Sequence, residues 1–153
     1  MKIGYFCNTT NREKKSYTQI LEETRDIAIY CDKNKWESIW FTEHHFNHEG
    51  MENCANPLMM STDIAARTKN IRIGQAANII TFHNPLRLAE DIATLDHISN
   101  GRLEVGVGRG VYGREAIHMN VEADLKDQAK NKRLFEETLT IMKKAWTEEF
   151  FNH

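Results

Sequence analysis

The 153-residue sequence lacks the features that would tie it to a membrane, to nucleic acid or to an oxidising compartment. No apolar run approaches the length of a membrane-spanning helix, and the apolar core of the start, MKIGYFCNTTNREKK, is too short for a signal peptide. The net charge is only −2, from 20 basic and 22 acidic residues spread along the chain, so nothing favours a nucleic acid or a membrane surface as partner. The three cysteines show no CxxC pairing, which predicts reduced thiols in a cytoplasmic protein.

The composition is that of an ordinary globular protein. Apolar residues make up 41% of the sequence and charged residues 27%. A chain of this length forms one domain at most, and we expect residues 1–153 to be a single domain.

Four short β-prone runs each precede a longer stretch with helical spacing. The runs cover residues 2–7, 37–41, 71–76 and 103–107, and their starts recur about every 32–35 residues. The helical spacing is clearest in the last stretch, at Phe135, Leu139, Met142 and Trp146. This repeat predicts four βα units with a parallel sheet and right-handed crossovers.

Helix boundaries are also visible in the sequence. Asn56-Pro57 and Asn84-Pro85 each place a good N-cap before a proline, which suits the first helical position. Asn100-Gly101 is a typical helix end before the fourth strand.

Two α/β architectures fit this repeat. One is a doubly wound sheet, which would be complete at four or five strands. The other is a (β/α)8 barrel, which needs about 250 residues, so that this chain would carry about the first four βα units. In both architectures ligands bind at the carboxyl ends of the strands.

Polar or glycine-rich residues follow every predicted strand. They are Cys7-Asn8, Thr42-Glu43-His44-His45, Ala76-Ala77-Asn78 and Gly108-Arg109-Gly110-Val111-Tyr112. Parallel strands bring these groups to one rim. A carboxylate, two imidazoles, an arginine and a phenol on one rim suit an acid–base reaction on an anionic or phosphorylated ligand.

Other interpretations of these motifs remain open. His44 and His45 are adjacent rather than spaced as HExxH, which argues against a metal site, but they could simply cap a strand and bond to backbone. Residues 108–113 spell the dinucleotide-binding pattern GxGxxG. That pattern should open a helix at once and meet an acidic residue about 20 positions on, whereas we expect irregular structure over 114–124 and no further strand. Gly4, Gly74 and Gly106 could merely permit close packing.

The combined motifs resemble a known family. The start "MKIGYF", the stretch "WFTEHHF" and the block "NPLRLAEDIATLDHISNGRLEVGVGRGVY" are similar to the bacterial luciferase-like, flavin-dependent monooxygenases, most closely the alkanal monooxygenase branch. The resemblance runs from the first residue to Trp146 or beyond. It implies a (β/α)8 barrel that binds reduced FMN at its carboxyl rim and uses O2 to oxidise a second, small organic substrate.

The resemblance also assigns roles to individual residues. It implies that His44 is the catalytic histidine beside the flavin, with Glu43 and His45 as its neighbours in the pocket. Ala76 and Ala77 match a pair joined by a cis peptide bond under the flavin ring. Arg109 matches an arginine that meets the FMN phosphate, and Tyr112 a pocket tyrosine. A flavin reductase is the expected donor of reduced flavin.

The sequence departs from the family in two places. At Gly108 the luciferases proper carry a reactive cysteine, so light emission is not implied. The chain also reaches His153 just after the fourth βα unit, which predicts a half-barrel that is at least dimeric. We therefore keep open a flavin monooxygenase, a non-catalytic or flavin-binding fragment of one, and a small doubly wound nucleotide-binding module.

Overall fold

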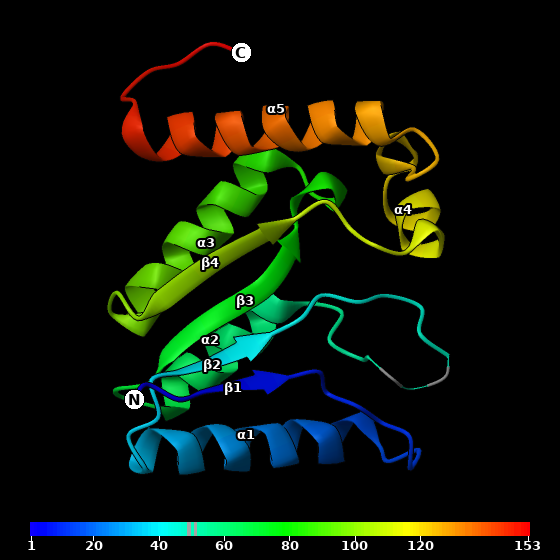
Figure 1. Ribbon diagram of the computed structural model, residues 1–153. Coiled ribbons are helices and arrows are strands. Elements are labelled where there is room, and N and C mark those ends of the chain that lie inside the picture. Colours follow the sequence, from blue (N-terminus) through cyan, green and yellow to red (C-terminus); the bar gives the residue numbers. More distant parts are fainter. Residues whose placement is uncertain (49, 51) are drawn as a thin grey trace. The chain divides into compact units, whose positions relative to one another are not determined.

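The computed structural model describes residues 1–48, 50 and 52–153, and strands alternate with helices along this chain (Figure 1). In order, the elements are β1 (Gly4–Cys7), α1 (Tyr17–Lys33), β2 (Ser38–Phe41), α2 (Pro57–Arg67), β3 (Arg72–Ile79), η1 (Ile80–Phe82), α3 (Pro85–Ser99), β4 (Leu103–Gly108), α4 (Gly113–Met119), η2 (Val121–Ala123) and α5 (Gln128–Thr147). None of the helices in this described part combines the length and the apolar character that a membrane-spanning segment needs.

The chain divides into two compact units. Unit 1 comprises Met1–Asn78 and Leu95–Gly106, and unit 2 comprises Ile79–Thr94 and Val107–His153. Helix α3 and strand β4 each run from one unit into the other.

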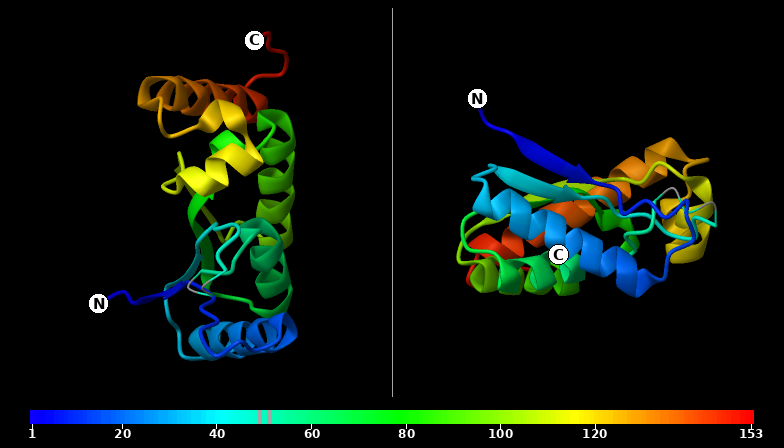
Figure 2. Two further views of the ribbon diagram at one scale, coloured as in Figure 1. Left: turned by 90° about the vertical axis from the view of Figure 1, so that its right-hand side faces the viewer. Right: turned by 90° about the horizontal axis from the view of Figure 1, so that it is seen from below.

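The parallel sheet predicted from the sequence is present. Strand β1 pairs in parallel with β2, β2 pairs in parallel with β3, and the strand order is β1-β2-β3-β4. The register aligns Phe6, Trp40 and Gly74 in one row across three strands. Helices α1 and α2 lie on one side of these strands (Figure 2). Ile39 and Ile73, which alternate with that row, are fully buried, as expected on the face that helices cover.

Glycines inside the strands allow close approach, which confirms the packing interpretation. A Cβ atom at Gly74 would overlap the indole ring of Trp40, and one at Gly106 would overlap the backbone carbonyl of Gln75. The Trp40 indole therefore lies over Gly74 of β3. Its Nε1 donates to Ser38 Oγ, on its own strand β2, at 2.8 Å.

The amino-terminal ends of the strands in unit 1 are fastened by two charged side chains. The Asp32 carboxylate, at the end of α1, accepts the backbone N–H groups of residues 69, 70 and 71 at 3.1, 2.8 and 2.7 Å. The Arg102 guanidinium donates to the backbone carbonyls of Ser99, Ile71 and Ala65 at 2.7, 3.0 and 3.0 Å. These bonds tie α1, α2 and α3 to the start of β3, at the end of the sheet opposite the carboxyl rim.

The helix boundaries follow the predicted signals. Asn56 Oδ1 accepts the N–H of Met59 at 2.9 Å before Pro57, and Asn84 Oδ1 accepts the N–H of Arg87 at 3.1 Å before Pro85. Asn100 and Gly101 adopt left-handed φ angles of 58° and 74° after α3.

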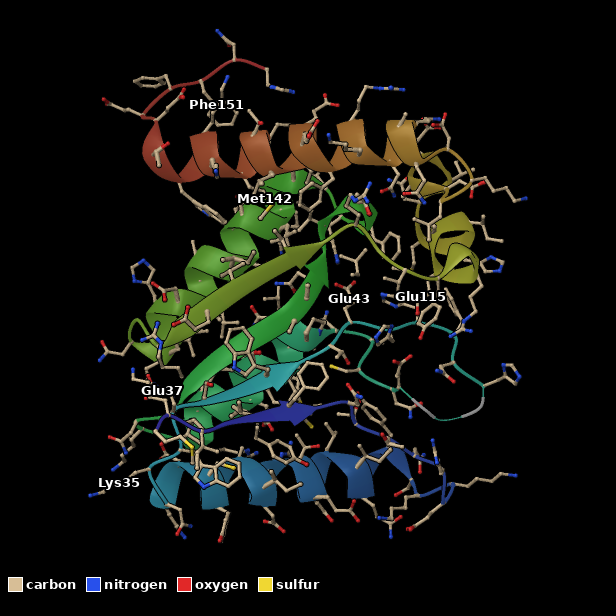
Figure 3. All side chains as sticks on the ribbon, in the orientation of Figure 1. Lys35, Glu37, Glu43, Glu115, Met142 and Phe151 are labelled. Carbon is tan, nitrogen blue, oxygen red and sulfur yellow. The ribbon has the colours of Figure 1, made fainter. Side chains whose placement is uncertain are left out.

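Unit 2 contains elements that the sequence analysis missed. Residues 114–124 are not irregular, because they hold most of α4 and all of η2. Both short elements contribute to a small core through their alanines; its members are Ile79, Phe82, Ala116, Ala123, Leu125 and Leu134. Helix α5 packs on the first half of α3, since Trp146 Nε1 donates to the Ala89 carbonyl at 3.0 Å. Figure 3 labels Met142, which is fully buried on α5.

Candidate active site

The stretch that follows β2 in unit 1 holds two histidines paired with two carboxylates. His45 Nε2 lies 3.0 Å from Glu43 Oε1, and both side chains are buried. His44 Nε2 lies 3.5 Å from Glu52 Oε1, and the His44 N–H donates to the Cys54 carbonyl at 2.9 Å. Figure 3 labels Glu43 just beyond the end of β2.

The two imidazoles therefore have different carboxylate partners although they are adjacent in sequence. Each carboxylate lies beside the ring that it faces and restricts the orientation of that ring. The interpretation that both histidines only cap a strand misses these side-chain contacts. Outside residues 49 and 51, no group of three or more His, Cys, Asp or Glu side chains is arranged to hold a metal ion.

The neighbouring end of β3 presents two alanines. The peptide bond between Ala76 and Ala77 is cis, as the family resemblance implies, and Ala76 is exposed. Phe41 pairs with Gln75, so the next residues along, Thr42 and Ala76, continue the same register at the rim. The stretch containing His44 and the alanine pair therefore belong to adjacent strand ends of one unit.

Two buried oxygen atoms at this rim have no hydrogen-bond partner among the described residues. They are Thr42 Oγ1, on a side chain that is 4% exposed, and Asn8 Oδ1, at the end of β1. A buried hydroxyl and a buried amide oxygen left in this way indicate a site that takes a polar ligand or water. The small, exposed side chain of Ala76 on the neighbouring strand and these two oxygens are compatible with a flat, polar ligand such as a flavin.

The cysteines near this rim do not supply a nucleophile. Burial raises the pKa of Cys54 to about 12, and burial also raises the pKa of Cys7. Both residues are therefore neutral thiols at physiological pH.

Unit 2 carries the remaining predicted residues. Arg109 follows β4 and is half-buried, and Gly110 beside it has a left-handed φ of +85°. The Tyr112 ring lies under the guanidinium of Arg114, whose Cζ is 4.8 Å from the ring centroid. This segment offers a cation at the start of the loop and an aromatic ring at its end.

The structure also corrects the expectation that no helix opens directly after the GxGxxG run. A helix does open at Gly113, at the end of the GxGxxG run. It has only seven residues, and the position about 20 residues after the first glycine lies within α5 rather than at a strand end. The absence of a strand end at that position therefore still argues against a dinucleotide-binding site.

One partner in unit 1 escaped the sequence analysis. Glu52, which faces His44, is reached through the irregular segment after β2, where no periodicity marks it. Asn8 and Thr42 were visible as strand-end residues, but only the structure reveals their buried, unsatisfied oxygens.

Comparison with known proteins gives a consistent result. The model of a family described as luciferase-like monooxygenase matches residues 1–153. The alkanal monooxygenase beta chain of Vibrio harveyi is 31% identical over 147 residues, which cover 96% of this chain and 43% of that protein. The oxygenase component of the flavin-dependent trigonelline monooxygenase of Acinetobacter baylyi is 28% identical, over 90% of this chain and 37% of that protein.

Solved structures agree with the sequence relatives. The monooxygenase RslO1 of Streptomyces bottropensis is 31% identical, with a TM-score of 0.87 over 97% of this chain and 44% of that one. The oxygenating constituent of 3,6-diketocamphane monooxygenase, from Pseudomonas putida and in complex with FMN, is 27% identical, with a TM-score of 0.92 over 100% of this chain and 41% of that one. The chain thus spans about two fifths of the length of these relatives, and the predicted fold class, the first four βα units of the (β/α)8 type, is confirmed.

Proposed function

Because the chain belongs to the luciferase-like monooxygenase family, we propose that it binds FMN and takes part in the oxidation of a small organic substrate by O2. The observation that carries this proposal is the rim of unit 1. There a histidine–carboxylate cluster and two unsatisfied buried oxygens lie at strand ends neighbouring the Ala76-Ala77 pair.

Within unit 1 each group has a proposed role. His44 is the catalytic residue, which holds or moves a proton at its Nε2, and Glu52 keeps that atom oriented. Glu43 and His45 support the cofactor from a buried pair. Ala76 and Ala77 provide a small, open surface for the flat ring of the flavin.

Within unit 2 the proposed roles concern the recognition of a phosphate. The Arg109 guanidinium binds the FMN phosphate, because a planar guanidinium suits a phosphate in a bidentate contact. Tyr112 lines the pocket beside it. When bound, reduced FMN supplies the electrons with which O2 is activated toward the organic substrate.

The relatives also bear on partners. The trigonelline enzyme is described as an oxygenase component, which implies a separate component. We propose a flavin reductase as the partner that supplies reduced FMN to this chain. Alkanals and a cyclic diketone are in the names of two relatives, so aldehydes and cyclic ketones are the first substrates to test.

A non-catalytic, flavin-binding role is the second candidate. It is favoured by the same rim, whose buried oxygens without partners among the described residues suit ligand binding with or without a reaction. The two candidates differ in one observable: both predict FMN binding, and only the monooxygenase predicts an oxidised organic product.

Replacement of Arg109 tests the cofactor assignment. Arg109→Ala should weaken FMN binding about tenfold or more and leave riboflavin binding within about twofold, because only FMN carries a phosphate. Both dissociation constants are measured by quenching of flavin fluorescence. Arg133→Ala, which removes an exposed cation on α5, serves as the control. Equal losses for both flavins in Arg109→Ala would contradict the assignment.

A further inference from the structure

The backbone carbonyl of Arg109 is held from two different elements of unit 2. Thr81 Oγ1, on η1, donates to it at 3.3 Å, and Asn131 Nδ2, on α5, donates to it at 3.3 Å. Thr81 is 1% exposed and Asn131 is fully buried. A carbonyl at the start of a surface loop would ordinarily bond to water, so two buried protein donors on one oxygen restrict how this peptide can turn.

Both donors are themselves fixed in place. The same Nδ2 of Asn131 donates to the Ala123 carbonyl of η2 at 2.9 Å, and Asn120 Nδ2 donates to the Thr81 carbonyl at 2.8 Å. Ala123 belongs to the core of this unit. The loop after β4 is thus braced by three side chains that no sequence motif had singled out.

The brace determines where the next N–H group points. The peptide bond between Arg109 and Gly110 is trans, so its N–H is directed opposite to its C=O, away from Thr81 and Asn131. A side chain at Gly110 would be strained at its φ of +85° and would crowd Ile79 and Phe82, each 3.3 Å from the Cβ position. A glycine here lets the backbone itself approach a ligand.

We propose that Asn131 and Thr81 are positioning residues for a phosphate subsite formed by the Arg109 side chain and the Gly110 N–H. A guanidinium and a backbone N–H are both donors, which phosphate oxygens accept. The inference rests on the proposed binding of FMN and extends that proposal. The affinity for the phosphate would depend on buried side chains that do not touch the ligand. It also assigns a backbone contact that side-chain replacement of Arg109 alone would leave in place.

The Gly110 amide is the direct reporter of this subsite. In the ¹⁵N-labelled chain, FMN and inorganic phosphate should both shift the Gly110 amide resonance, and riboflavin should leave it in place. A hydrogen bond to a phosphate oxygen deshields the amide proton, whereas riboflavin has no phosphate to offer.

Two variants from different elements test the brace. Asn131→Leu and Thr81→Val each remove one bond to the Arg109 carbonyl at similar volume. Each should weaken FMN binding about fivefold to tenfold, keep riboflavin binding within about twofold, and reduce the Gly110 response to phosphate. Thr138→Val is the matched control, because Thr138 is also buried on α5 and no hydrogen bond joins it to the Arg109 loop in the described structure.

The possible outcomes separate this inference from the proposed function. If neither flavin binds, yet phosphate shifts Gly110 in the unmodified chain and not in Asn131→Leu, the subsite is supported and the flavin function fails. If FMN binds in preference to riboflavin while Gly110 does not move, or both variants keep the full preference, the inference is overturned and the function survives. The inference would also be overturned if Asn131→Leu, Thr81→Val and Thr138→Val all lowered the affinities for FMN and riboflavin equally, as a general loss of stability would.

Discussion

His44 and His45 show how far the identity of a residue predicts its environment. Their place at a strand end followed from the apolar run before them. The structure gives each ring a different carboxylate, Glu52 and Glu43. Glu43 is only two residues from His45, so their contact could be anticipated from the sequence. The Glu52 contact depends on how an irregular segment returns, which no local pattern specifies.

His44→Ala tests the proposed catalytic role. We expect turnover of an oxidised substrate to fall about a hundredfold, because proton transfer by a positioned side chain contributes at least that much. FMN binding should stay within about twofold, and circular dichroism should be unchanged. Turnover is measured with aldehydes and cyclic ketones as probes, with His97→Ala on α3 as the control histidine. Unchanged turnover would remove His44 from this role.

The backbone contacts of Asp32 predict how the stability of the protein depends on pH. Partial burial opposes its ionisation, but the backbone N–H groups of residues 71, 69 and 70 prevail and hold the pKa of the carboxyl below its ordinary value. A carboxyl with a lower pKa in the folded state stabilises the protein above the unfolded pKa, near 4, and loses that effect as the pH falls through the folded pKa. The contribution is therefore complete at pH 7.

Asp32→Asn should lower the free energy of unfolding by about 1–2 kcal/mol at pH 7, because a neutral amide oxygen accepts these N–H groups less strongly. The difference from the unmodified chain should shrink steadily below about pH 4. Urea denaturation across this pH range measures it, and Asp26→Asn, on an exposed position of α1, is the control. A difference that grows toward acid pH would refute the assigned contacts.

The strands and helices divide into those with strong local signals and those without. The four strands and the helices after Asn56 and Asn84 could be located because caps, prolines and apolar periodicity agree. Helix α1 begins with a capping box, in which Ser16 and Gln19 bond reciprocally at 3.3 and 3.0 Å, and this signal was present in the sequence. Helix α4 had none, because Ile117 and Met119 are exposed and only Glu115 and Ala116 are buried.

The contact between β2 and β3 provides a test at this scale. Gly74→Ala should lower the free energy of unfolding by about 1–3 kcal/mol, because the added methyl group overlaps the Trp40 indole and forces it to move. Gly113→Ala is the matched control, since a Cβ there meets no atom within 4 Å, and it should be neutral or slightly stabilising. Tryptophan fluorescence during urea unfolding reports the stability of both variants. Equal effects of the two replacements would show that Trp40 does not lie over Gly74.

At the scale of the whole molecule, the sheet face in unit 1 opposite the helices bears on association. Phe6 is 56% exposed in the row that it shares with Trp40 and Gly74. Because large apolar side chains exposed on a sheet favour association, we predict that the purified chain forms at least a dimer. Light scattering checks the mass against the 17.8 kDa of one chain. Replacement of Phe6 by Ser should shift the population toward the monomer, and a wild-type monomer would contradict the prediction.

Family membership and the first four βα units could be recognised from the sequence because the motifs at the strand ends and the repeat agree with each other. The brace on Arg109 could not, since Thr81, Asn120 and Asn131 lie far apart in sequence and meet only through folding. The same holds for Arg102, whose bonds to residues 65, 68 and 71 have no local signature.

An anaerobic titration of the purified chain with reduced FMN, read by the change in protein fluorescence, shows directly whether this chain binds flavin. We predict saturable binding with a dissociation constant of about micromolar or tighter, weaker for reduced riboflavin. Absence of saturable binding by a folded chain would contradict the claim that this chain carries a flavin site.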